Sequence, residues 1–121
     1  MAIRIDKHSG IPVYIQIMNQ IKKEIILGRI KEGDKLPPTR DLAKRLNVNI
    51  NTILKAYERL QFEGIIEARH GVGYFVSKRS FISQTVLEEI RKLAHILREE
   101  GIDLLIATII LEEVYKNDKE G

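Results

Sequence analysis

Two amphipathic segments separated by a short turn constrain the fold of this chain more than any other feature. In the first segment, two prolines followed by the capping hydroxyl of Thr39 indicate the start of a helix. Its apolar residues recur at helical spacing and are Leu42, Ala43 and Leu46. Asn47 is a plausible end for this helix, because Asn tolerates a positive φ better than most residues do.

The second segment begins only two residues later, where Asn49 can cap a third helix of the chain. Its apolar stripe has the i, i+3, i+4, i+7 spacing of a buried helix face and consists of Ile53, Ala56, Tyr57 and Leu60. Gly64 is expected to end it. Two such helices joined by a short turn are the sequence form of a helix-turn-helix.

The flanking sequence predicts one helix before this motif and a β-hairpin after it. The first helix is expected to start at Pro12 and to end at Gly28. The strand-like runs Ile65–Arg69 and Tyr74–Ser77 are joined by a connector with two glycines. This order predicts an α+β, mainly α fold, in which a winged helix-turn-helix occupies residues 1–79.

The remaining segment, residues 80–121, predicts two helices. A seam of apolar residues with helical spacing contains Ile82, Val86, Ile90, Leu93 and Leu97. After Gly101, the run from Asp103 to about Lys116 is apolar nearly all round, with Leu105, Ile109 and Ile110 among its members. Such a helix needs burial on more than one side. Either the winged domain or a second copy of the chain must cover it, and we favour self-association.

Composition supports a nucleic-acid partner and excludes several other classes of function. Residues 1–79 carry 15 Lys and Arg against 8 Asp and Glu, whereas residues 80–121 carry 5 against 9. A net charge of +7 beside one of −4 suggests a polyanion-binding module joined to a segment that avoids polyanions. The alternative is that segments this small differ by a few charges by chance. There is no cysteine, and the three histidines lack metal-ligand spacing, so we expect no metal and no cofactor.

Other sequence signals point away from membranes and from catalysis. The N-terminus lacks the pattern of a signal peptide, which predicts a cytoplasmic protein. The longest apolar stretch is too short for a bilayer, which takes about 20 residues. The paired glutamates near the C-terminus are adjacent on a helix and do not face each other, and the serines show no nucleophile motif. We therefore expect no enzyme.

Several spaced motifs within residues 10–77 resemble the GntR family of transcription regulators. They are LPPTRDLA at 36–43, VNINTI at 48–53, Ala56-Tyr57, Leu60, EGI at 63–65 and GVGYFV at 71–76. The VNxNT run and the Ala-Tyr pair resemble the YtrA-like branch of that family. The short tail is also similar to that branch, in which a helical segment mediates dimerisation.

The resemblance implies which residues contact DNA. They come from the two helices of the motif and from the wing tip, and they are Thr39, Arg40, Lys44, Asn49, Asn51, Thr52, Lys55, Arg69, His70 and Gly71. Arg40 would bind phosphate or guanine, and Asn is suited to a bidentate contact with adenine. Bland alternatives stay open, including an ion pair of Arg40 with Asp41 or Glu63 and a purely capping role for Asn49.

The chain also departs from the family pattern. Many members carry DNA-contacting arginines at the positions of Ile50 and Leu54. The YtrA-like branch also tends to lack them, so the resemblance to that branch holds. Because two of the residues that read the usual operator are missing, the operator sequence cannot be carried over from the family.

The resemblance predicts a homodimer that binds a two-fold-symmetric double-stranded operator. The two chains would pair through a segment that includes Val86, Ile90, Leu93, Leu97, Leu105, Ile109 and Ile110. Repression by blocking polymerase is the family's common mode, often over the regulator's own operon. A small-molecule effector, if the protein uses one, would have to bind at the dimer junction or between the domains. The alternative hypothesis is a protein-interaction module whose apolar C-terminal helices recruit a different partner.

Overall fold

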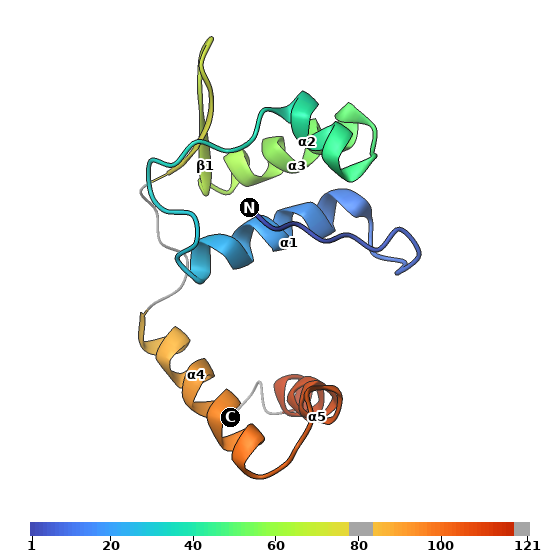
Figure 1. Ribbon diagram of the computed structural model, residues 1–121, viewed down its shortest axis with the longest axis vertical. Helices are drawn as coiled ribbons and strands as arrows, with labels where there is room; N and C mark the ends of the chain where they lie inside the picture. Colours follow the sequence, from blue (N-terminus) through green and yellow to red (C-terminus); the bar gives the residue numbers. More distant parts are fainter. Residues whose placement is uncertain (78–83, 118–121) are drawn as a thin grey trace. The chain divides into compact units, whose positions relative to one another are not determined.

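The computed structural model describes residues 1–77 and 84–117, which fall into two compact units, Met1–Ile82 and Ser83–Gly121 (Figure 1). The first unit contains the helices α1 (Val13–Ile26), α2 (Thr39–Leu46) and α3 (Ile50–Phe62) and the strands β1 (Ile66–Arg69) and β2 (Gly73–Val76). The second unit contains α4 (Gln84–Glu99) and α5 (Leu104–Asn117). The predicted fold class, a winged helix-turn-helix followed by two helices, is confirmed.

Helix α1 buries three apolar side chains together with one charged residue. Ile17, Met18 and Ile21 lie in the core. Glu24 continues this stripe by one turn and is also buried, at 1% exposure. Its carboxylate is paired with Arg29, at 2.9 Å between Oε2 and the guanidinium. The helix ends before Gly28, which has a φ of +76°.

The helix-turn-helix follows the predicted pattern with one correction. Helix α2 begins at Thr39, and its N-cap residue is Pro38, which has an extended backbone and no side-chain acceptor. The Thr39 hydroxyl therefore lies one position too late to cap, and the helix has no side-chain cap. Asn47 adopts a left-handed conformation, with a φ of 54°, and turns the chain toward α3.

Helix α3 supplies the centre of the core. All four residues of its predicted stripe, Ile53, Ala56, Tyr57 and Leu60, are fully buried. The Tyr57 hydroxyl donates a hydrogen bond to the carbonyl oxygen of Pro37, at 2.8 Å. The Tyr57 ring also meets the Tyr74 ring edge to face, with 4.9 Å between the centroids. One side chain thus ties α3 to the start of α2 and to the wing.

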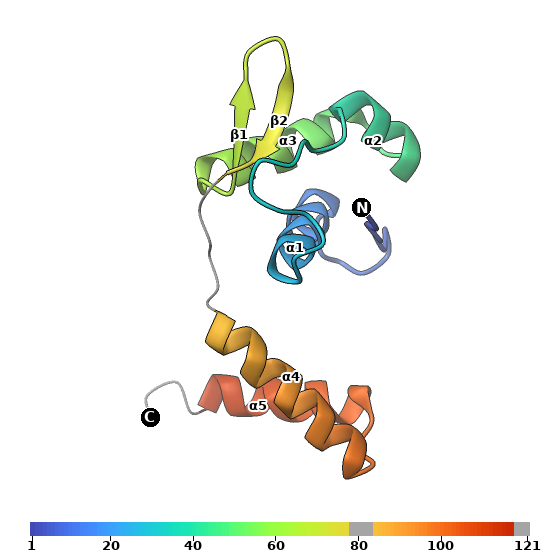
Figure 2. The same ribbon diagram turned by 60° about the vertical axis from the view of Figure 1, so that its left-hand side comes forward.

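The hairpin has the predicted antiparallel form, but β1 is one residue shorter than predicted and β2 is displaced by one residue. Arg69 pairs with Gly73 and Ile66 with Val76, so β1 starts one residue later, and β2 starts and ends one residue earlier, than predicted. Segment 33–36 lies along β2, with Lys35 bridged to Phe75. The backbone N–H groups of Gly33 and Leu36 donate to this strand. In Figure 2 the hairpin projects from the end of α3, on the side away from α1.

The second unit leaves its apolar side chains largely uncovered. The turn between its helices contains Gly101, with a φ of +72°, and Asp103, whose carboxylate accepts the N–H of Ile106 at 2.9 Å. Leu87 is the only buried residue of α4, and α5 has none. Ile82, the first member of the predicted seam, lies outside the described residues.

Candidate nucleic-acid interface

The start of α3 presents polar groups to solvent. The Asn49 side chain caps the helix by accepting the backbone N–H of Asn51 at 2.8 Å. Capping occupies the Asn49 carbonyl, while its amide N–H groups remain for other partners. Asn51 is exposed and Thr52 is half-buried. The geometry therefore suits both roles considered for Asn49, a helix cap and a DNA contact.

Lys55, one turn further along α3, lies over an aromatic ring. Its Nζ atom is 4.2 Å from the centroid of the Tyr14 ring, and the Arg59 guanidinium is 5.8 Å from the same centroid. Tyr14 belongs to the first turn of α1. The cation–π contact fixes the direction of the Lys55 stem, and the side chain stays exposed.

The two apolar departures from the family pattern have different environments on α3. Ile50 is partly buried and packs against the core. Leu54 is 39% exposed. The apolar Leu54 side chain is therefore accessible at a position where an arginine would reach DNA in many family members.

Helix α2 carries an exposed arginine near its N-terminus. Arg40 and Lys44 are exposed and Thr39 is half-buried. Glu63, one of the two partners considered for Arg40, binds Lys22 instead, with 2.8 Å between the charged atoms. Within residues 1–77 and 84–117, the guanidinium of Arg40 has no ion pair. The ion-pair alternative for Arg40 is therefore not realised in this structure.

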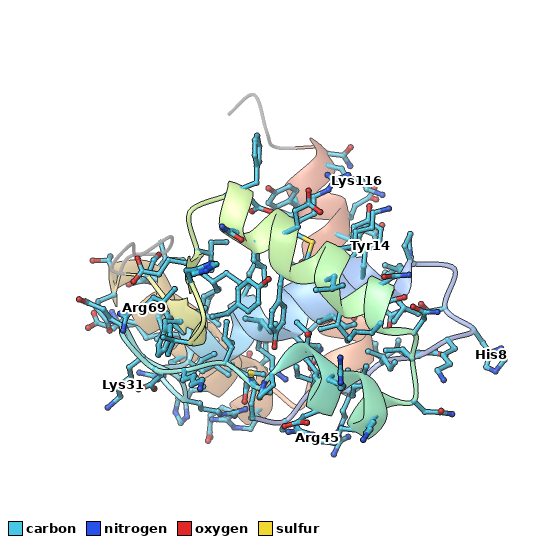
Figure 3. All side chains as sticks on the ribbon, turned by 90° about the horizontal axis from the view of Figure 1, so that it is seen from above. His8, Tyr14, Lys31, Arg45, Arg69 and Lys116 are labelled. Carbon is cyan, nitrogen blue, oxygen red and sulfur yellow. The ribbon has the colours of Figure 1, made fainter. Side chains whose placement is uncertain are left out.

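The wing holds its arginine in a defined place. Arg69 lies over the Phe75 ring at 4.0 Å and pairs with Glu67 at 3.2 Å. Arg69, His70 and Gly71 are all exposed, and Figure 3 shows Arg69 at the edge of the unit.

Lys35 is a further cation of the wing that no sequence motif indicated. Its backbone is bridged to Phe75, and its Cε atom would lie 3.0 Å from a Cβ placed on Gly73. Lys35 therefore lies against β2, the strand that contains Phe75, the aromatic partner of Arg69. Only the pairing of segment 33–36 with β2 reveals this position, because Lys35 is distant from the hairpin in sequence.

The residues predicted to mediate dimerisation form an apolar surface on the second unit. Val86, Ile90 and Leu93 of α4 are exposed and Leu97 is half-buried. On α5, Leu105, Ile109 and Ile110 are at least half exposed. Between the two helices is a groove of about 190 Å³ with a nearly all-apolar lining, formed by Ile90, Leu93, Ala94, Leu97, Leu104, Ala107, Thr108 and Leu111.

Metal and membrane chemistry are not represented in the described part of the chain. No three or more His, Asp or Glu side chains there are grouped so as to hold a metal ion. None of the described helices combines the length and the apolar character that a bilayer span requires.

Comparison with known proteins identifies the family. The bacterial regulatory proteins of the gntR family match residues 13–76. The chain is 38% identical to the HTH-type transcriptional repressor YtrA of Bacillus subtilis (strain 168), over 98% of this chain and 90% of that protein.

Two solved structures are similar as well. YtrA from Sulfolobus acidocaldarius, a GntR-family transcription factor, has a TM-score of 0.63 and 39% identity, covering 78% of this chain and 99% of that one. The AraR DNA-binding domain in complex with operator ORE1 has a TM-score of 0.54 and 27% identity, covering 64% of this chain and 94% of that one. The protein therefore belongs to the GntR family, on its YtrA-like branch, and is a DNA-binding transcription regulator, not an enzyme.

Proposed function

We propose that this protein is a homodimeric repressor that binds a two-fold-symmetric operator, controls its own operon and acts in the cytoplasm. Residues 1–79 would bind DNA and residues 80–121 would hold the dimer together. The observation that carries the proposal is the uncovered apolar surface of α4 and α5, in the same chain as a winged unit whose exposed residues are polar and cationic.

Self-association accounts for this apolar surface. Leu104 and Leu105 are 78% and 71% exposed, and every large apolar side chain of α5 is at least 47% exposed. Contiguous apolar patches of this kind mark sites of association in soluble proteins. A second copy supplies the same patch in return, which is the arrangement of a two-fold dimer interface.

The groove between α4 and α5 fits a partner's side chains better than a separate ligand. Its volume of about 190 Å³ is below the roughly 300–1,000 Å³ of typical small-molecule sites. Its lining offers Thr108 as the one polar side chain to orient a ligand. We therefore assign this groove to the dimer and not to an effector.

On DNA, the start of α3 would enter the major groove while α2 and the wing contact the backbone and the minor groove. Asn49, Asn51, Thr52 and Lys55 would meet base edges or nearby phosphates. Thr39, Arg40 and Lys44 would bind the backbone, and Arg69, His70 and Gly71 would reach the minor groove. Lys35 is added to the wing contacts because it lies against β2.

Repression is the mode suggested by the relatives. The Bacillus subtilis protein is named as a transcriptional repressor, and it aligns with nearly the whole of this chain. The AraR DNA-binding domain is seen on an operator. Repression by a bound dimer needs no chemistry beyond occupancy of the operator.

The DNA-binding part of the proposal is tested with duplexes selected from a random pool. Selection yields the operator, and half-sites with inverted symmetry are expected. Affinity should fall linearly with salt on a log–log scale, with a slope of about −0.9 per neutralised phosphate. Arg40→Ala should lower operator affinity by about tenfold or more, as the loss of one charge-assisted contact implies.

Two controls separate a lost DNA contact of Arg40 from a general loss of charge and from unfolding. Arg98→Ala removes the same charge from an exposed position in α4 and should leave operator affinity unchanged. Circular dichroism should show Arg40→Ala fully folded, because the side chain is exposed and makes no ion pair among the described residues. An unchanged affinity for Arg40→Ala would remove it from the interface.

The dimer is tested with charged substitutions on α5. Leu105→Glu and Ile109→Glu replace side chains that are 71% and 60% exposed in the single chain. A charge there costs little in a monomer, but it is buried without a partner in the proposed interface. Both variants should sediment as folded monomers at micromolar concentration, whereas Val72→Glu, at the tip of the wing, should remain dimeric.

The same measurement tests the alternative function, recruitment of a different protein. If the unmodified chain is itself a monomer at tens of micromolar, the dimer is refuted, and a heterologous partner for the apolar helices becomes the better hypothesis.

A further inference from the structure

We propose that the N-terminal loop, residues 6–11, is an additional part of the DNA interface and that Lys7 binds a phosphate there. The inference rests on the DNA-binding surface proposed above. It extends that surface beyond residues 13–76, the segment matched by the family.

The loop is held in place by one side chain of α1. Gln16 accepts the backbone N–H of Asp6 at 2.7 Å. Its amide nitrogen, which has two N–H groups, lies 2.8 Å from the carbonyl oxygens of both Asp6 and Ile11, with the Ser9 hydroxyl oxygen also within reach at 3.0 Å. A single glutamine therefore spans both ends of the loop. Residues between these ends have a defined position against the helix.

The hydrogen bonds of Lys7 place the loop beside the helix-turn-helix. Its ammonium donates to the carbonyl oxygen of Asn47 at 2.7 Å. Asn47 is the left-handed residue that joins α2 to α3, two positions before the cap residue Asn49. The charge of Lys7 thus lies next to the end of α3 that is proposed to enter the major groove.

A second contact connects the same region of the chain to α3. Tyr14, in the first turn of α1, lies under the Lys55 ammonium at 4.2 Å. The segment from Lys7 to Tyr14 therefore touches the turn before α3 at one end and the first turns of α3 at the other. Figure 3 shows Tyr14 near α3, and His8 projecting from the loop toward solvent.

The chemistry of Lys7 favours a phosphate over a base. An ammonium has three N–H donors, and Asn47 uses one of them. Within the described residues, no carboxylate pairs with Lys7. The exposed ammonium can therefore bridge the turn and a phosphate oxygen. Contacts of this kind hold the register of a protein on the duplex and carry no sequence information.

The experiment compares Lys7→Met with the unmodified protein on the selected operator and on a mixed-sequence duplex, across a series of salt concentrations. Each lost phosphate contact should reduce the magnitude of the log–log slope by about 0.9, or by about 1.8 for a dimer. At 0.1 M salt the same relation corresponds to roughly an eightfold loss of affinity per contact. The loss should be similar on both duplexes.

Two further variants separate a phosphate contact from other effects. Lys31→Met removes the same charge from an exposed lysine of the same unit, seen at the opposite edge from His8 in Figure 3, and should leave the slope unchanged. Lys7→Arg keeps the charge and should keep the slope.

The outcomes are distinct. If Lys7→Met weakens binding without changing the slope, Lys7 only fixes the turn, and the proposal is wrong. An unchanged affinity, or an equal effect of Lys31→Met, also overturns it. If the unmodified protein shows no salt-dependent binding to any duplex, it is the proposed DNA interface as a whole that fails, before Lys7 is tested.

Discussion

Removal of the Tyr57 hydroxyl should destabilise the winged unit by a predictable amount. The hydroxyl donates to the Pro37 carbonyl at 2.8 Å, and the residue is fully buried. Burial raises the pKa of Tyr57, as does neighbouring Tyr74, so the hydroxyl keeps its proton and remains a donor well into the alkaline range. Tyr57→Phe retains the ring and its edge-to-face contact with Tyr74 but leaves the carbonyl without this donor.

The magnitude follows from the energetics of a single buried hydrogen bond. A neutral hydrogen bond contributes about 0.5–1.5 kcal/mol, and a buried group left unsatisfied costs about 1–3 kcal/mol. We therefore expect a loss of about 1–2 kcal/mol in the free energy of unfolding. For a domain of this size, each kcal/mol corresponds to a fall of about 4–8 °C in Tm.

Urea unfolding followed by circular dichroism measures this loss, at one fixed protein concentration so that the proposed dimerisation contributes equally to all samples. Tyr14→Phe is the matched control, because the Tyr14 hydroxyl has no hydrogen-bond partner in the described part of the chain. It should change stability by less than about 0.5 kcal/mol. Equal stability of the two variants would refute the assigned role of the Tyr57–Pro37 hydrogen bond.

The remaining predictions concern the buried carboxylate and the hairpin. Burial raises the pKa of Glu24, but hydrogen bonds and nearby positive charges outweigh burial and lower it, so its ionised form stabilises the fold near neutral pH. This contribution should disappear as the pH falls from about 4.3 through the lowered pKa. Glu24→Gln should thus lose about 1.5–3 kcal/mol at pH 7 but less at pH 3.5 in urea titrations, whereas exposed Glu32→Gln should lose little at either; equal losses at both pH values would contradict this. Gly73 has a φ of +143° and Lys35 in close approach, so Gly73→Ala should lower stability by about 1–3 kcal/mol, and more than Gly71→Ala, whose added Cβ meets open space; the reverse order in thermal melts would show that the hairpin backbone is not constrained at Gly73.

The fold was predictable because the spacing of apolar residues in the local sequence indicates which face of a helix is buried. The stripe of α3 has helical spacing, and the residues from Ile53 to Leu60 that were predicted to be buried are all fully buried. Asn47 and Asn49 likewise act locally, one through a positive φ and the other through a side-chain cap. Such features depend on neighbours within a few residues, so sequence spacing is sufficient to find them.

Parts of the candidate site depend on contacts between distant segments, and these were not predictable. Lys35 joins the wing only because its segment lies along β2. Lys55 meets Tyr14 from another helix. The burial of Glu24 was not predictable, because nothing in the local spacing indicates that Arg29 and the N-terminal backbone would pair with its carboxylate. The environments of Lys35, Lys55 and Glu24 are all set by contacts with segments that spacing within one helix or strand does not indicate.

The net charge and the exposed apolar surface both change between residues 1–79 and residues 80–121, and together these changes have a consequence for operator binding. Residues 80–121 combine a net charge of −4 with the uncovered apolar surface, while residues 1–79 carry +7. The negative charge of the helical segment disfavours contact with DNA, and its apolar surface fits the proposed dimer. If it joins two winged units, the second unit meets its half-site at an effective concentration that reaches the millimolar range for short connections.

Dimerisation should therefore contribute to operator affinity without any direct contact to DNA. Leu105→Glu leaves every proposed DNA contact in place, yet it should weaken binding to the full operator by about 10²-fold or more, the lower end of the gain expected from linked sites. Binding to an isolated half-site should be unchanged. Fluorescence anisotropy with both duplexes makes this comparison at one salt concentration. A monomeric Leu105→Glu variant that binds the full operator as tightly as the unmodified protein would show that the two winged units act independently, and the proposed coupling between the apolar helices and DNA recognition would be wrong.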